Sequence, residues 1–357
     1  MKSIVLTDHF GGGGAERVAS LLINGLSESP ENEVHVCVFI DSNNYGVVKE
    51  RVKYHLLSPK QYPYALNVLN RIRNLRKVIM TVRPDVIYSF GPIMASYVVT
   101  ATALSGWRKH IKIVSSERND PRKEPVSELK KIVRNYCYHH SDVIVCQTPM
   151  AVELLKQQGV ETKFVIIPNP VTPNLPTWKG QNSKEIITAA RLTEQKNLPL
   201  LIDAFARIHH EYPMYRLTIY GEGELRNSLQ SYIEKKGLTN RISIPGFATN
   251  IHQIMMHAYM YVSSSDYEGI SNSMLEALGI GLPCVCTDCP VGGAGMYIKD
   301  GVSGILTKVG NEDELYRGMK RLIEDPPLGL FFSEESVKVR EILTLEKITN
   351  MWINLAI

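Results

Sequence analysis

The sequence predicts an α/β protein built from two doubly wound domains of similar size. Short apolar segments typical of buried parallel strands alternate with amphipathic, helix-like segments along the whole chain. This alternation runs twice, and a segment without hydrophobic periodicity separates the two series. The length of 357 residues also exceeds one typical core and suits two domains.

The predicted strands fall into two sets of six. The first set is SIVLT, EVHVCVFI, DVIYSF, KIVSS, DVIVCQ and FVIIPN, and the second is EIITAA, RLTIYG, RISIPG, MYVSSS, PCVCT and SGILT. Between them, PNPVTPNLPTWKGQNSK is rich in Pro, Asn and Gly and indicates a linker or hinge. We therefore expect one domain over residues 1–170, a second over 171–340, and a final helix over 341–357 that packs back toward the first domain.

Composition excludes several classes of protein. With 44% apolar and 21% charged residues, the chain is neither disordered nor fibrous. The apolar run in MKSIVLTDHF is too short for a signal peptide, and no stretch reaches the roughly 20 apolar residues of a membrane span. The six cysteines show no disulfide framework, so a reducing cytoplasm is the expected setting.

Charge is uneven along the chain. The first 171 residues hold 22 Lys and Arg against 15 Asp and Glu, whereas the rest hold 18 against 21. The basic clusters mark either solvated helix faces or an anionic partner, which would be a phospholipid surface or a pyrophosphate-bearing acceptor. No stacking aromatics interleave with them, so a nucleic acid is not expected. The clusters are Arg71, Arg73, Arg76, Lys77 and Lys130, Lys131, Arg134.

Two loops indicate phosphate binding. The first, GGGGAER, places Gly11–Gly14 between the first strand and a helix, where backbone N–H groups can approach an anion. It lacks the spaced dinucleotide fingerprint, and a merely structural tight turn remains an alternative. The second, in EIITAARLTEQKN, places Arg191 and Lys196 beyond a strand end, where the carboxyl edge of a parallel sheet suits a diphosphate. Without the rest of the chain, two exposed surface cations would be the favoured explanation of this second pattern.

The segment SSSDYEGISNSMLEALGIGLP is the most informative. Glu268 and Glu276 lie in it with a strand before them and a helix after them, and Gly269 permits a sharp turn. We expect Glu268 in that turn and Glu276 directed from the helix toward a ribose. The first N–H groups of this helix can receive a phosphate. Ser271, Asn272 or Ser273 can cap this helix, and Gly269 and Met274 are expected beside them at its start.

In these motifs the sequence resembles the family-four glycosyltransferases. The resemblance covers nearly the whole chain through GGAER, PDVIYSF, SERNDP, PNPV, AARLTEQKN, YGEGELR, IPGF, EGISNSMLEALGIGLP and DGVSGILT. It implies the GT-B fold, in which two Rossmann-like domains face a cleft. The N-terminal domain would bind mainly the acceptor and the C-terminal domain the nucleotide sugar.

The resemblance also implies a function and residue roles. The activity would be retaining transfer of a hexose or N-acetylhexosamine from a UDP-linked sugar to a glycan or lipid-pyrophosphate-linked acceptor. Such transferases act in capsule or lipopolysaccharide synthesis, here as a cytoplasmic enzyme at the inner face of the plasma membrane. Arg191 and Lys196 would grip the diphosphate, and Glu268 would contact the sugar. Glu276 would contact the ribose, and Gly13 and Gly14 would close over the phosphates. The remaining expected donor contacts are Glu117, Arg118, Gly269, Asn272, Ser273 and Met274.

Two departures qualify the expected site. Many relatives carry a histidine in the segment matching SSERNDP, where this chain has Glu117, Arg118 and Asn119, and the sequence leaves open which of these faces the sugar. No Asp-x-Asp triplet occurs, so we expect neither metal nor cofactor, with Arg191, Lys196 and a helix dipole supplying the charge. The cysteines of PCVCTDC have no fourth ligand at a sensible spacing.

The expected mechanism relies on the donor itself. By the resemblance, the departing phosphate accepts the acceptor hydroxyl's proton on the same face of the sugar, and the protein supplies positioning and electrostatic stabilisation. Two alternatives remain. One is a nucleotide-sugar 2-epimerase of the same fold, and the other is a catalytically idle nucleotide-sugar-binding partner of another transferase.

Overall fold

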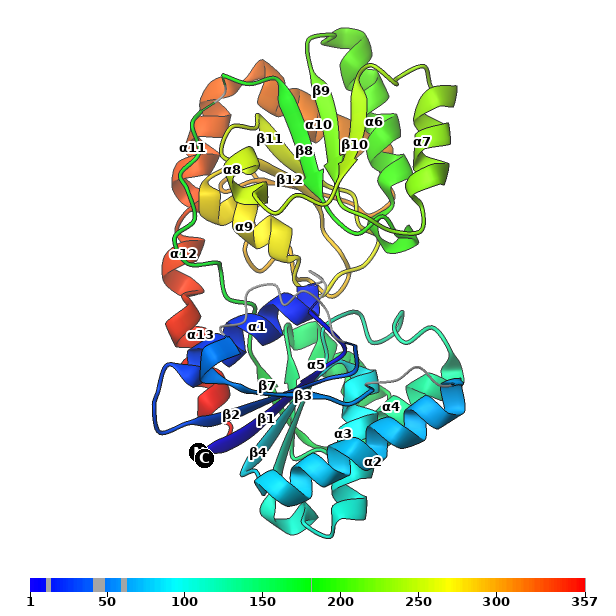
Figure 1. Cartoon of the computed structure of the whole chain (residues 1–357). Coiled ribbons are helices and arrows are strands. Elements are labelled where there is room, and N and C mark those ends of the chain that lie inside the picture. The colour runs from blue at the N-terminus through cyan, green and yellow to red at the C-terminus, as the bar shows by residue number, and fades with distance from the viewer. Residues whose placement is uncertain (11–13, 41–48, 59–62, 181, 357) are drawn as a thin grey trace. The chain divides into compact units, whose positions relative to one another are not determined.

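The chain forms two compact units (Figure 1). The computed structural model describes residues 1–10, 14–40, 49–58, 63–180 and 182–356. The N-terminal unit contains Met1–Pro170 together with Leu345–Ile357, and the C-terminal unit contains Val171–Thr344. The first boundary coincides with the one expected at 170/171. The chain returns to the N-terminal unit four residues later than expected, at 344/345 instead of 340/341.

The N-terminal unit is built on a parallel seven-stranded sheet of order β3-β2-β1-β4-β5-β6-β7. Its inner strands are apolar runs that are buried on both faces, as expected where helices cover both sides of a parallel sheet. β3 was not predicted, because this short edge strand is only half-buried and has no apolar run. The strands are β1 (Lys2–Thr7), β2 (Glu33–Val38), β3 (Lys53–Leu56), β4 (Val86–Phe90), β5 (Lys112–Ser116), β6 (Val143–Cys146) and β7 (Lys163–Ile166).

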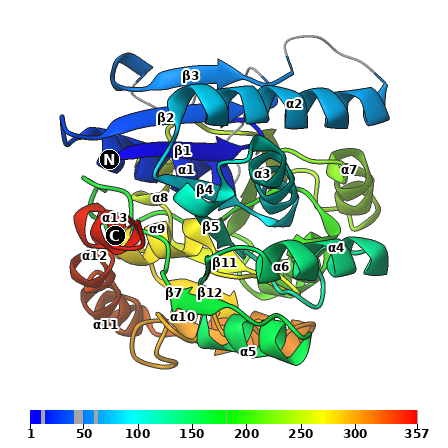
Figure 2. The same ribbon diagram turned by 90° about the horizontal axis from the view of Figure 1, so that it is seen from below.

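Helices cover both faces of this sheet (Figure 2). α2, α3 and α4 pack side by side on one face, and α1 packs against the C-terminal helix α13 on the other, as right-handed crossovers require. Gly25 permits the α1–α13 contact, since a Cβ there would lie 2.5 Å from the Thr349 hydroxyl. The helices are α1 (Gly14–Ser27), α2 (Tyr64–Val82), α3 (Pro92–Ser105), α4 (Glu128–His139), α5 (Pro149–Gln157) and α13 (Leu345–Ile353), with short 3-10 turns η1 (Lys49–Arg51) and η2 (Arg108–His110).

The C-terminal unit has a parallel six-stranded sheet of order β10-β9-β8-β11-β12-β13. Each strand corresponds to one predicted apolar segment. The strands are β8 (Glu185–Ala189), β9 (Arg216–Tyr220), β10 (Ile242–Gly246), β11 (Met260–Ser263), β12 (Cys284–Thr287) and β13 (Ile305–Thr307). The other elements are η3 (Glu194–Lys196), α6 (Leu198–Glu211), α7 (Arg226–Lys235), α8 (Ile251–Met255), α9 (Asn272–Ile280), α10 (Glu312–Glu324), α11 (Pro326–Ser336) and α12 (Val339–Ile342).

From Val171 onward, the segment expected to be a linker packs as part of the C-terminal unit. No regular element occupies its described residues between β7 and β8. Nevertheless Trp178 is buried, and its indole N–H donates to the Ala258 carbonyl at 2.8 Å. Over the described ranges, none of the helices combines the length and apolar character needed to cross a membrane.

Candidate functional site

The C-terminal sheet has a switch point between β8 and β11. Successive strands are added outward from β8 toward β10 on one side and from β11 toward β13 on the other. In doubly wound sheets the loops diverge at such a point, and ligands bind at the carboxyl ends of the two central strands. Here the loop after β8 carries Arg191 and Lys196, and the loop after β11 carries Glu268.

Glycine allows the loop after β8 to lie against its neighbour. Gly221, which follows β9, has φ +140°, and a Cβ on it would lie 1.8 Å from the Ala190 carbonyl oxygen. The Ala190 N–H donates to the Tyr220 carbonyl at 2.9 Å and the Leu192 N–H to Glu222 at 2.9 Å. The backbone on either side of Arg191 is therefore fixed.

The loops after β8 and β11 are joined through an ion pair between Lys196 and Glu268. Both side chains are largely buried, at 13% and 17% exposure. The Ser265 hydroxyl donates to Glu268 at 3.1 Å, and the Gln195 amide donates to the Tyr267 carbonyl at 2.8 Å. The structure thus brings together two of the three residues predicted to be catalytic.

Arg191 differs from Lys196 in its surroundings. Its side chain is exposed and forms no ion pair with any residue that the structure describes. Lys196 by contrast is neutralised by Glu268. Arg191 is therefore the readily available cation, whereas Lys196 must share its charge between Glu268 and any bound anion.

The helix expected after the turn is α9. Ser271 is its N-cap and accepts the Met274 N–H at 3.4 Å, so of the three predicted capping residues Ser271 takes the role. The Ser273 hydroxyl contacts the Tyr261 hydroxyl at 2.8 Å, and Asn272 is half-buried. The Met274 side chain is buried, so a donor contact there would have to use the backbone.

Glu276 lies on α9 and is only 4% exposed. One carboxylate oxygen contacts His252 Nε2 at 2.9 Å, and the other accepts from the Thr172 hydroxyl at 3.2 Å. These partners hold the carboxylate in one orientation. The contact with a ribose stays a prediction.

The turn at Gly269 is held against the loop that follows β12. A Cβ on Gly293 would lie 1.7 Å from the Gly269 carbonyl oxygen, so only glycine permits this approach.

The cysteines after β11 are buried. Burial raises the pKa of the Cys289 thiol to about 12, and that thiol donates to the Ser265 carbonyl at 3.3 Å. Cys284 and Cys286 are also buried. In the described part of the chain, no cluster of three His, Cys, Asp or Glu residues is arranged to hold a metal.

In the N-terminal unit, Glu117 follows β5 and points inward, with 2% exposure. One carboxylate oxygen accepts the N–H groups of Arg118 at 2.9 Å and Asn119 at 3.2 Å, and the other accepts from the Tyr138 hydroxyl at 3.2 Å. Burial raises the pKa of Glu117 to about 7, although the neighbouring Arg134 opposes the shift. Glu117 is therefore held inside the unit by these hydrogen bonds, and its contact with the donor sugar stays a prediction.

Arg118 is the better candidate for a ligand contact from this loop. Its guanidinium donates through Nη2 to Asn169 and lies 5.7 Å from the centre of the Phe90 ring. Its other terminal nitrogen, Nη1, is buried without a hydrogen-bond partner. An unsatisfied charged donor is unfavourable, so this nitrogen favours an anionic or carbonyl ligand. Of the first loop, Gly13 lies outside the described residues, and Gly14 begins α1.

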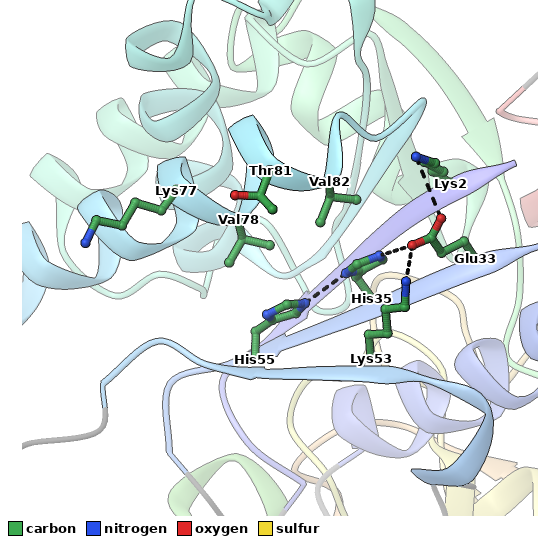
Figure 3. A pocket seen from close by; sticks show the side chains of 9 residues that line it. All are labelled: Lys2, Glu33, His35, Lys53, His55, Lys77, Val78, Thr81 and Val82. Carbon is green, nitrogen blue, oxygen red and sulfur yellow. Dashed lines mark hydrogen bonds and ion pairs between the residues drawn. The ribbon is translucent and has the colours of Figure 1, made fainter.

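A hollow of ≈ 490 Å³ lies elsewhere in the N-terminal unit (Figure 3). His35 Nδ1 lies 2.8 Å from His55 Nε2, and His35 Nε2 lies 3.0 Å from Glu33. Lys2, Glu33 and Lys53 are the first residues of their strands. The hollow therefore lies at the amino ends of these strands, the edge opposite to the one where doubly wound sheets bind ligands.

Sequence reasoning missed the partners that orient the predicted residues. Gln195, His252, Ser265 and Thr172 contact the two glutamates but were not singled out. Gln195 directly precedes Lys196, and this adjacency was the one sequence feature that could have pointed to Gln195 as a site residue. His252 and Thr172 lie far from Glu276 in sequence, so no local pattern connects them.

Comparison with known proteins identifies the family. The model described as Glycosyltransferase Family 4 matches residues 12–175, and Glycosyl transferases group 1 matches residues 177–339. An uncharacterized glycosyltransferase of Methanocaldococcus jannaschii is 27% identical, over 80% of this chain and 78% of its own. The Campylobacter jejuni N-acetylgalactosamine-N,N'-diacetylbacillosaminyl-diphospho-undecaprenol 4-alpha-N-acetylgalactosaminyltransferase is 26% identical, over 89% of each chain.

Solved structures agree on the fold. Anabaena HepE in complex with UDP and glucose superposes with a TM-score of 0.87 at 18% identity, covering 99% of this chain and 98% of that one. Staphylococcus aureus TarM in complex with UDP gives 0.83 at 14% identity, covering 99% of each. Both units thus have the Rossmann-like architecture expected from the sequence. The chain belongs to the family-four, group 1 glycosyltransferases of the GT-B fold.

Proposed function

We propose that this protein is a retaining glycosyltransferase in surface polysaccharide synthesis. It moves a hexose or N-acetylhexosamine from a UDP-linked donor to a hydroxyl of a glycan or lipid-linked oligosaccharide. One observation carries the proposal. Arg191, Lys196, Glu268 and the loop leading into α9 all follow the two central strands at the C-terminal switch point.

This arrangement suits a sugar diphosphate. Arg191 is exposed and available to an anion, and the N-terminus of α9 favours negative charge. Lys196 supplies a second cation, which Glu268 holds in place. Glu268 also presents a carboxylate that can accept hydrogen bonds from sugar hydroxyls. The two cations would stabilise the charge on the leaving diphosphate, so the reaction would proceed without a metal.

Retention follows from attack on the face from which the diphosphate departs. In the proposed step, the acceptor oxygen forms a bond to the anomeric carbon as the bond to the diphosphate oxygen breaks. The acceptor's proton passes to that departing phosphate. The protein positions both reactants and stabilises the oxocarbenium-like charge distribution.

The acceptor class is supported by the relatives. The Campylobacter jejuni transferase is named for a diphospho-undecaprenol acceptor, and a Staphylococcus aureus relative that is 23% identical is named for poly(ribitol-phosphate). Both acceptors carry phosphate. Arg118, with its buried unpaired nitrogen at the carboxyl edge of the N-terminal sheet, is the described side chain best suited to bind such a group.

The test begins with a panel of UDP- and GDP-sugars scored by thermal shift, because a ligand of the folded state raises the melting temperature. The donor so identified is then incubated with a diphospho-undecaprenol-linked oligosaccharide, and NMR determines the anomeric configuration of the product. We expect the configuration of the donor to be kept. An inverted product contradicts retention. Release of an epimerised sugar nucleotide would identify a 2-epimerase, and binding without transfer or hydrolysis would identify an idle partner.

A further inference from the structure

The outer face of α4 is apolar. Leu129, Ile132, Val133 and Tyr136 recur at the spacing of one helix face and are 71%, 66%, 45% and 60% exposed. Val126, just before the helix, is 84% exposed. An amphipathic helix on a soluble domain ordinarily turns such a face inward, so this orientation requires an explanation.

The fold does not use this apolar face, because α4 is anchored through its opposite side. There Arg134 is 1% exposed and donates at 2.8 Å to the carbonyls of Pro121 and Glu124. Cys137 and Tyr138 are buried on the same side. Arg134 had been grouped with Lys130 and Lys131 as a candidate surface cation, and the structure shows that this assignment was wrong.

α2 adds positive charge to the same helical layer. α2 packs against α3, and α3 packs against α4, all on one face of the sheet (Figures 1 and 2). The outer side of α2 exposes Leu66 and Leu69 followed by Arg73 and Lys77, and the helix contains no acidic residue.

Only part of the predicted basic cluster is free to contact a partner. Arg71 lies 4.3 Å above the Phe39 ring and donates to Ser58. Arg76 donates to the Leu104 carbonyl at 2.7 Å. Arg73 and Lys77 remain as the exposed cations of this cluster. On α4, Glu128 is paired with Lys131 at 2.7 Å, while Lys130 is exposed.

We propose that the outer surface of the α2–α4 layer lies on an anionic lipid bilayer. The four apolar side chains of α4 would enter the boundary between headgroups and acyl chains, with Tyr136 at the headgroup level. Arg73, Lys77 and Lys130 would contact anionic headgroups. Charge favours a lipid surface as the partner, because exposed cations accompany the apolar face and Glu128, the acidic residue of α4, is already paired with Lys131. The inference draws on the lipid-linked acceptor proposed above, but its test needs no turnover.

The test is flotation of the full chain with phosphatidylcholine vesicles, with and without phosphatidylglycerol. Wild type should float with the anionic vesicles at low salt and less at high salt. Leu129→Ser/Ile132→Ser should weaken binding by about tenfold or more, since burying even one leucine contributes on that scale. The matched control is Leu330→Ser/Ile342→Ser in the C-terminal unit, where the two side chains are 53% and 60% exposed. It should bind like wild type.

Charge is tested in the same assay. Arg73→Gln/Lys77→Gln should reduce binding and its salt dependence, whereas Lys308→Gln/Arg317→Gln makes the same change of charge in the C-terminal unit and should not. Equal binding of an α4 variant and its control overturns the proposal. The proposal also fails if wild type does not bind anionic vesicles at low salt. The oligomeric state is measured in parallel by analytical ultracentrifugation. If wild type is a dimer and the α4 variant is a monomer, this face binds a second copy of the chain and not a membrane. If the protein transfers sugar to a soluble acceptor but does not bind vesicles, the proposed membrane surface is wrong and the proposed reaction still stands.

Discussion

Lys196 and Arg191 are expected to share a role in turnover but to differ in their effect on stability. Lys196 is 13% exposed and paired with Glu268, which is 17% exposed. In Lys196→Ala, Glu268 keeps hydrogen bonds from Ser265 and Gln195 but loses its cation. Leaving a mostly buried carboxylate in this state costs about 1–3 kcal/mol. Arg191→Ala removes an exposed side chain and should change stability by no more than about 0.5 kcal/mol.

These values translate into measurable shifts in the melting temperature. For a unit the size of Val171–Thr344, each kcal/mol lowers the melting temperature by roughly 2–4 °C. Calorimetry should therefore find Lys196→Ala lower by roughly 2–12 °C and Arg191→Ala close to wild type. Adding Glu268→Gln to Lys196→Ala removes the unpaired charge and should recover part of the loss.

Initial rates with saturating donor supply the second measurement. Each single variant should lower turnover by on the order of a hundredfold, as the loss of one electrostatic contact to a transition state does. Arg317→Ala on α10, another exposed arginine of the same unit, is the matched control and should retain wild-type turnover. Near-normal turnover in both site variants would remove them from the site. A wild-type melting temperature for Lys196→Ala would refute the structural role of its pair.

Three further predictions concern metal and pH. Turnover should persist in excess EDTA if Arg191 and Lys196 supply the charge that a metal would otherwise provide, and a complete loss that magnesium restores would contradict this. Burial raises the pKa of Glu117 from its usual value near 4.5 to about 7, so folding becomes less favourable as pH rises through this interval. Glu117→Gln should flatten that part of the stability curve in urea unfolding, and parallel curves would speak against the shift. Lys53 and His35 lower the pKa of Glu33 to about 2. The contribution of this carboxylate to the free energy of unfolding is therefore present above pH 4.5 and is lost as pH falls toward 2. Glu33→Gln should reduce the fall in stability between pH 5 and pH 3, whereas an unchanged fall would exclude this carboxylate as a cause.

The main elements of the fold could be predicted from sequence because the buried strands of parallel sheets are continuous apolar runs. EIITA and CVCT are recognisable as strands without further information, and both lie where expected. β3 could not be found in this way. Its sequence KYHL is polar, and its pairing with β2 depends on a neighbour that only the folded sheet supplies.

In the candidate site too, sequence could predict some features and not others. Arg191, Lys196 and Glu268 lie in loops that directly follow apolar strands, and sequence predicts the order of these strands and loops. The direction of a side chain depends instead on what packs around it. Glu117 was one of three residues that could face the donor sugar, and sequence could not predict that Tyr138 and two backbone N–H groups hold its carboxylate inside the unit. The partners of Glu276 come from α8 and from the segment before β8, so only the three-dimensional structure could identify them.

The return of the chain to its first unit has a consequence for the order of synthesis. The Trp352 carbonyl accepts a hydrogen bond from the buried Tyr88 hydroxyl at 3.1 Å, and Trp352 is 1% exposed. Val171–Thr344 is one continuous segment, so all of its residues are present without the last helix. The first 170 residues are made first, but they lack α13 until the end of the chain has been synthesised. A released chain that ends before Leu345 would therefore hold a complete second unit beside an incomplete first one, and residues 1–170 expressed alone would leave apolar surface uncovered.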